Sequence, residues 1–129
     1  MEQLQEATYF PTKIYAIKKP EFLEAVKAVS ARYLEESKKT LGEGQHMTVM
    51  TTTYAHEPAL EEFAGYVSQT AWNILQAQGY AMDNMVTYFT EMWTQEHHKH
   101  SSMEQHIHGY GSQIVGFYFL EAPEGCSRV

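Results

Sequence analysis

The fold is decided by the second half of the chain, where residues 84–95 are NMVTYFTEMWTQ and residues 112–121 are SQIVGFYFLE. Val, Thr, Tyr, Phe and Trp are frequent in both stretches, and these residue types favour strands. The second stretch is apolar almost throughout, which predicts a strand buried on both faces. Between them, residues 96–105 are polar and predict a loop. A turn at 123–125 then precedes residues 126–129, which predict the start of another strand.

The first half of the chain carries two amphipathic helical patterns. Apolar residues recur every three or four positions from residue 20 to 38 and again from 56 to 79. Charged and polar residues occupy the intervening positions, as on the solvent side of a surface helix. Pro20 and Pro58 lie near the two starts, where proline suits the first turn of a helix. We therefore expect two helices in this half.

Two shorter stretches of the first half, residues 7–17 and 47–53, are rich in β-branched or aromatic residues and predict short strands, the first at a sheet edge because Pro11 interrupts it. This order of elements predicts an α+β domain, with two N-terminal helices packed on one side of a mainly antiparallel sheet. The length suits a single domain, 1–129. Within it we expect residues 1–80 to support a sheet core that begins in residues 84–129.

Composition and charge exclude several classes of protein. The formal net charge is −7 with neutral histidines, which argues against a nucleic-acid-binding surface because phosphate contacts need clustered Lys and Arg. The one cysteine, Cys126, rules out a disulfide within the chain and predicts a reducing, cytoplasmic compartment. We expect no signal peptide and no membrane association, because no apolar run approaches the roughly 18 residues of a membrane span.

Five of the seven histidines lie between residues 97 and 108. Imidazole is the commonest side-chain metal ligand. In an extended segment, the side chains of His106 and His108 would point to the same side, with Cα atoms roughly 6.5 to 7 Å apart. Both rings could then bind one ion at about 2.1 Å each, so the spacing predicts a metal site. Solvated loop positions are expected for the other three, His97, His98 and His100.

A useful metal site needs a third ligand, and the sequence offers two weak candidates. Glu104 has the strand parity of the two histidines, but on an extended strand it would lie about 13 Å from His108. Glu121 ends the next predicted strand and would approach only through strand pairing. The third ligand and any catalytic residue therefore stay open at this point.

Several segments resemble a known family. Residues 92–129 are similar to the 2-oxoglutarate/Fe(II)-dependent oxygenases carried by marine bacteriophages, in which a Trp-containing strand, a polar loop, a His-x-His element and a Gly-aromatic-Tyr strand follow one another. The matching features here are Trp93, the loop 96–105, His106-Ile107-His108 and Gly116-Phe117-Tyr118-Phe119-Leu120. The opening segment 9–15 also resembles the N-terminal strand of that family. The resemblance covers much of the chain, and its motifs are moderately specific.

The resemblance implies a jelly-roll (double-stranded β-helix) sheet. It also implies Fe(II) held by two histidines and a carboxylate, with 2-oxoglutarate as the co-substrate. His106 falls at the first iron ligand, whereas His108 stands where the wider superfamily has Asp or Glu. No later histidine follows, and Arg128 is the only basic residue after Lys99. The jelly roll is therefore expected to be incomplete at the C-terminus, either in a fragment of a longer protein or in a shortened, inactive relative.

Three functions follow as expectations. The first is an oxygenase that hydroxylates a small molecule or a protein, with Trp93 and Tyr118 beside the pocket. The second is a structural or interaction module, for example in a virion, whose incomplete sheet is completed by an oligomer partner or another chain. The third is a cupin-like metal protein, in which Gln113 replaces the usual glutamate. A phage-encoded chain would act in the host cytoplasm or in the virion.

Overall fold

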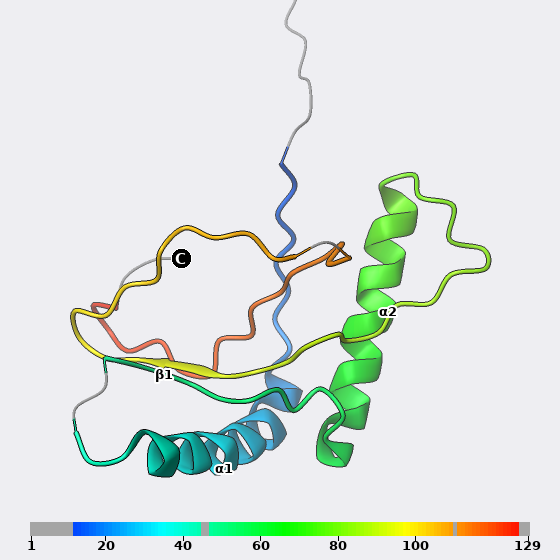
Figure 1. Cartoon of the computed structure of the whole chain (residues 1–129). Helices are drawn as coiled ribbons and strands as arrows, with labels where there is room; N and C mark the ends of the chain where they lie inside the picture. Colours follow the sequence, from blue (N-terminus) through cyan, green and yellow to red (C-terminus); the bar gives the residue numbers. More distant parts are fainter. Residues whose placement is uncertain (1–11, 45–46, 110, 127–129) are drawn as a thin grey trace, which may run out of the picture.

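The computed structural model describes residues 12–44, 47–109 and 111–126. Its helical elements are two short 3-10 turns, η1 (Pro20–Phe22) and η2 (Pro58–Leu60), which lead directly into the helices α1 (Leu23–Leu41) and α2 (Glu61–Ala77). Two strands, β1 (Thr48–Met50) and β2 (Gln95–His97), form an antiparallel pair. In Figure 1, α1 lies along one side of this pair and α2 stands beside it, steeply inclined to α1.

The first helix forms where the apolar periodicity predicts it. Pro20 opens η1, where its missing N–H group leaves no donor unpaired. Val26 and Val29 are buried on the inner face of α1, and Phe22 and Tyr33 pack partly buried beside them. Gly42 ends the helix with φ 79°, a backbone conformation that glycine adopts without steric cost. The predicted helix over 20–38 is thus confirmed and runs three residues further.

The second helix also follows its pattern and ends in a Schellman motif. Leu60 and Phe63 bury its N-terminal part and Leu75 its C-terminal part. At the C-terminus the N–H of Tyr80 donates to the carbonyl of Leu75 (3.2 Å), and the N–H of Gly79 donates to that of Gln76 (2.9 Å). Gly79 has φ 96°, as this motif requires. The helix thus forms within the predicted range 56–79 and ends at this glycine.

The strand pair continues beyond its regular part. There, threonine hydroxyls accept some of the hydrogen bonds that backbone carbonyls accept in a regular pair. In the regular part Met50 lies opposite Gln95 and Val49 opposite Glu96. Further along, the Thr51 and Tyr54 N–H groups donate to the carbonyls of Thr94 (3.0 Å) and Met92 (2.8 Å). In the other direction, the N–H groups of Thr94 and Met92 donate to the hydroxyls of Thr51 (3.0 Å) and Thr53 (3.1 Å). The threonines thereby keep residues 51–54 and 92–94 together although the strand geometry is lost.

A ring of three hydroxyls joins α1 to this strand pair. The Thr94 hydroxyl donates to that of Ser30 (2.7 Å), the Ser30 and Tyr54 oxygens lie 3.2 Å apart, and the Tyr54 and Thr94 oxygens lie 2.5 Å apart. Each hydroxyl can donate to one neighbour and accept from the other. Ser30 and Tyr54 are buried, at 2% and 4% exposed. The ring therefore satisfies polar atoms that burial would otherwise penalise.

We expect the Tyr54→Phe variant to lose about 1 kcal/mol of unfolding free energy, because one hydroxyl leaves the ring while Ser30 and Thr94 keep their mutual hydrogen bond. Urea denaturation measures the loss. The control is Tyr80→Phe, which alters a tyrosine that is 57% exposed and should change nothing measurable. Equal stabilities of the Tyr54 variant and wild type would show that the hydroxyl ring contributes nothing.

The predicted jelly roll is wrong. Among the described residues the sheet has only two strands, β1 and β2, and the larger part of the described chain is helix and loop. Residues 84–94 and 112–121 form no strand, and residues 12–17 are extended without strand pairing. The predictions for residues 7–11 and 127–129 lie outside the described residues.

The burial and hydrogen bonding of residues 112–121 explain why the strand predicted there does not form. Tyr118 and Leu120 pack against the core, while Phe117 and Phe119 are 70% and 59% exposed. Residues 117–120 thus alternate between exposed and partly buried, as in a strand with one buried face, whereas residues 112–116 are all exposed. A strand also needs a neighbour for its backbone groups, and here no backbone hydrogen bond links residues 113–121 to another described segment. Amino-acid composition indicates a preference for strands, but it does not show whether a neighbouring strand is present for pairing.

Candidate metal site on the open face of the strand pair

The two faces of the strand pair have different neighbours. Val49 and Thr94 point towards α1, where Val49 is buried and Thr94 joins the hydroxyl ring. Side chains alternate along an extended chain, so Met50, Trp93 and Gln95 lie on the opposite face. Figure 1 shows α1 on one side of the pair and the orange segment that follows β2 on the other. Among the described residues, the face turned away from α1 is therefore covered by loop chain.

A depression of about 350 Å³ lies between this face and the returning chain. One wall consists of Met50, Trp93 and Gln95. The other wall consists of residues 103–106 and His108. The size suits a small ligand or a hydrated ion, since ligand sites in proteins start at roughly 300 Å³.

His106 and His108 lie together at this depression, as the sequence predicts. Their ring centroids are 5.3 Å apart and the ring planes are inclined by 63°. His106 is exposed, whereas His108 is half-buried against Trp93, with ring centroids 5.9 Å apart. The rings are not on opposite sides of the backbone, so two nitrogen donors border one space.

The His106 ring is held in one orientation by the backbone. Its Nδ1 lies 2.9 Å from the carbonyl oxygen of Glu104, so Nδ1 carries the proton and donates it. In the neutral ring, Nε2 then carries the free lone pair that a metal ion needs. Metal-binding histidines characteristically donate their second nitrogen to a carbonyl or carboxylate in this way, which fixes the tautomer.

The described residues fit two ligands of the expected iron triad but not the third. Among residues 12–44, 47–109 and 111–126, no group of three or more His, Cys, Asp or Glu side chains is placed to hold a metal ion. Glu104 lines the depression and its carbonyl orients His106. Glu121 pairs with Lys27 (3.2 Å) instead of approaching the histidines. Two imidazoles are therefore in place, and a carboxylate ligand is not.

The other predicted pocket residues divide between the depression and the core. Trp93 lines the depression, as expected. Tyr118 instead packs on Phe63, with centroids 5.2 Å apart, and donates its hydroxyl to the carbonyl of Lys19 (2.6 Å). Gln113, which the cupin pattern would require as a ligand, is exposed and does not line the depression.

The three neighbouring histidines are exposed, as predicted, and serve local contacts. His97 ends β2 and lies within 3.1 to 3.3 Å of Ser101, Gln95 and Thr48. His98 contacts Glu96 (3.0 Å). His100 has φ 72°, a conformation that suits its place in a turn. None of the three lines the depression.

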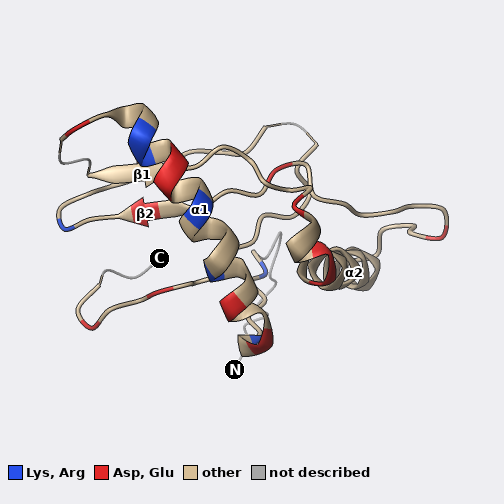
Figure 2. Cartoon of the chain, turned by 90° about the horizontal axis from the view of Figure 1, so that it is seen from below, with Lys and Arg blue, Asp and Glu red and all other residues tan. Residues whose placement is uncertain are grey.

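Glu96 ties β2 to α1. Its carboxylate accepts hydrogen bonds from Lys38 (2.7 Å) and from His98 (3.0 Å). The hydrogen bond from Lys38 is the largest cause that lowers the pKa of Glu96 below its usual 4.5, and partial burial opposes it. In Figure 2 basic and acidic residues alternate along α1, and an acidic position lies in β2 beside that helix.

This ion pair predicts acid sensitivity. The folded pKa of Glu96 is below its unfolded value, so the stabilisation is complete above about pH 4.5 and is lost as pH falls through the lowered folded value. Between about pH 6 and pH 3, Glu96→Gln should therefore lose less unfolding free energy than wild type. Urea denaturation at both pH values measures this difference. Identical losses in the two proteins would contradict the assignment.

Sequence reasoning missed Met50, Met103 and Gln95, which line the depression beside the histidines. Met50 and Gln95 meet because they are register partners in the strand pair. That pairing joins residues 45 positions apart, and no local pattern signals it. Met50 and Met103 are 48% and 44% exposed, and only the folded structure shows this exposure.

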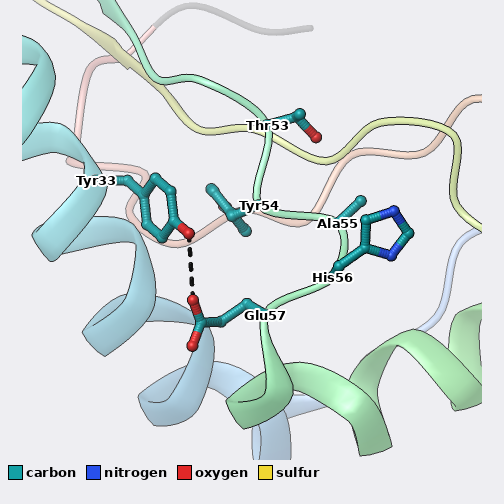
Figure 3. Close-up of a pocket in the computed structure, with 6 residues that line it drawn as sticks. All are labelled: Tyr33, Thr53, Tyr54, Ala55, His56 and Glu57. Carbon is teal, nitrogen blue, oxygen red and sulfur yellow. Dashed lines mark hydrogen bonds between the residues drawn. The ribbon is translucent and has the colours of Figure 1, made fainter.

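A second depression, of about 180 Å³, lies between α1 and residues 53–57. Figure 3 shows Glu57 turned towards Tyr33, whose hydroxyl donates to it (3.2 Å), and His56 turned away from both. Arg32 also contacts the Glu57 carboxylate (2.5 Å). Tyr33 and Arg32 thus both bind the Glu57 carboxylate, and the depression results from the packing of α1 against residues 53–57.

Comparisons with known protein families, curated proteins and solved structures give no match to this chain. In the described part of the chain, neither helix combines the length and apolar character needed to cross a membrane.

Proposed function

We propose that this chain is an iron protein of the 2-oxoglutarate-dependent oxygenase type, with His106 and His108 as two of the iron ligands. The observation that carries the proposal is the pair of imidazoles, with centroids 5.3 Å apart, at one open depression. The resemblance of residues 92–129 to such oxygenases supports the same assignment. The proposal rests on the site and does not include the jelly-roll sheet.

The chain's own residues would perform three tasks at this site. His106 and His108 would hold the ion, and the carbonyl of Glu104 would keep the His106 ring in its ligating tautomer. Trp93 would shield one side of His108 from water. Ferrous iron bound with 2-oxoglutarate supplies oxygen activation for hydroxylation. The remaining protein ligand would come from outside the described arrangement, since no carboxylate completes it there.

The test is the visible charge-transfer band that Fe(II) and 2-oxoglutarate give when they bind together without oxygen. We expect the band for the tag-free wild-type chain and its loss in His106→Ala. His56→Ala is the matched control, because His56 is exposed and lies outside the depression. If saturating iron and 2-oxoglutarate give no band with wild type, the proposal fails.

A second candidate, an interaction module, is favoured by residues 113–121. Their backbone makes no hydrogen bond to another described segment, and Phe117 and Phe119 are exposed at 70% and 59%. An apolar segment whose backbone makes no hydrogen bond to another described segment is suited to pairing with a strand of a partner or of a second copy. Light scattering of the purified chain tests this: a defined oligomer that Phe117→Lys dissociates supports it, and a monomer at high concentration contradicts it.

A further inference from the structure

Two methionines lie beside the histidine pair without a packing reason that accounts for both. Met50 extends from the open face of the strand pair, and Met103 comes from the chain that returns over that face. Both line the same depression as His106 and His108, and they are 48% and 44% exposed. Side chains recruited only to fill a core would be buried. Two methionine side chains and two histidine side chains therefore border one depression.

This donor set differs from that of an iron triad. A facial triad takes two imidazoles and a carboxylate, and no carboxylate completes the group among the described residues. Thioether sulfur is a soft donor that favours Cu(I), and imidazole also binds copper. Methionine has three rotatable bonds, so its sulfur can approach an ion without movement of the backbone. The donor atoms beside the histidine pair are therefore of the kind that a soft monovalent ion prefers as ligands.

We infer that the depression binds Cu(I) through His106, His108 and the sulfurs of Met50 and Met103. The inference uses the same two histidines as the proposed function and adds a second ion, one that competes with Fe(II) for them. Trp93 lies against His108, so it would report binding through quenched fluorescence. No electron transfer is involved, because copper is bound in the state in which it is supplied.

The test is a competition for Cu(I) against a chromogenic chelator, without oxygen, using the tag-free full chain. Wild type should bind one Cu(I). The double variant Met50→Leu/Met103→Leu should bind it at least about tenfold more weakly, because leucine keeps the apolar bulk and removes the sulfur. Met85→Leu is the matched control, since Met85 is 60% exposed and lies outside the depression. The Fe(II)/2-oxoglutarate band should be equal in wild type and Met85→Leu.

The outcomes separate this inference from the proposed function. Unchanged Cu(I) affinity in the double variant, or no Cu(I) binding by wild type, overturns the inference and leaves the iron assignment standing. Cu(I) binding that depends on both methionines, without any iron band, upholds the inference and removes the oxygenase. If the double variant fails to fold, X-ray absorption of Cu(I)-loaded wild type decides: sulfur neighbours of copper support the inference, and nitrogen neighbours alone contradict it.

Discussion

Replacement of both His106 and His108 with alanine should reduce the affinity for Co(II), used as a stable substitute for Fe(II), by at least about 100-fold. Loss of a residue that merely orients a ligand costs 10- to 100-fold, so loss of the ligands themselves should cost no less. Each single variant should retain weak binding through the remaining imidazole. Calorimetric titration of the tag-free proteins measures all three affinities.

The same experiment has two internal controls. His56→Ala removes an exposed histidine away from the depression and should bind as wild type does. His98→Ala removes a histidine that contacts Glu96 and lies outside the lining of the depression, and it should also leave the affinity unchanged. If either control weakens Co(II) binding as much as the double variant does, the ion is not held by His106 and His108 alone.

The second large effect concerns stability. Leu60→Ala should lower the unfolding free energy by about 2 to 5 kcal/mol, the range for leucine truncations that leave a buried cavity. Leu60 is 1% exposed and lies in the core cluster with Val26, Val29 and Tyr54. The total unfolding free energy of a small domain is only about 5 to 15 kcal/mol, so the variant should lose a large share of its stability. Urea denaturation followed by circular dichroism measures this loss.

Leu41→Ala provides the comparison for this truncation. Leu41 is the last residue of α1 and is 48% exposed, so its loss should change the unfolding free energy by less than about 0.5 kcal/mol. A Leu60 variant no less stable than the Leu41 variant would contradict the assignment of the core to the junction of α1, η2 and the strand pair.

The helices could be predicted from the sequence because their determinants are local. The apolar stripe of α1, the prolines that open η1 and η2, and the glycine stop at Gly79 all act within a few residues of one another. The sheet could not be predicted in the same way. Residues 84–91 and 112–121 have strand composition, yet the described structure gives them no strand neighbour. A strand depends on a partner that is distant in the sequence, and composition does not identify one.

Only part of the candidate site could be predicted from the sequence, for the same reason. His106 and His108 are two positions apart, and that spacing alone indicated that both rings would border one space, as they do. Met50 and Trp93 reach this space only because residues 48–54 pair with residues 92–97. The two histidines were therefore found from their spacing, whereas Met50, which reaches the site through long-range pairing, was not.

The central claim is that the rings of residues 106 and 108 bind one ion together. Pulsed electron paramagnetic resonance of the tag-free chain loaded with one Cu(II) tests it most directly, because this method counts coordinated imidazoles through their remote nitrogens. We expect two coordinated imidazoles in wild type, one in His106→Ala and none in the double alanine variant. One imidazole or none in wild type, or two retained in the double variant, would contradict it.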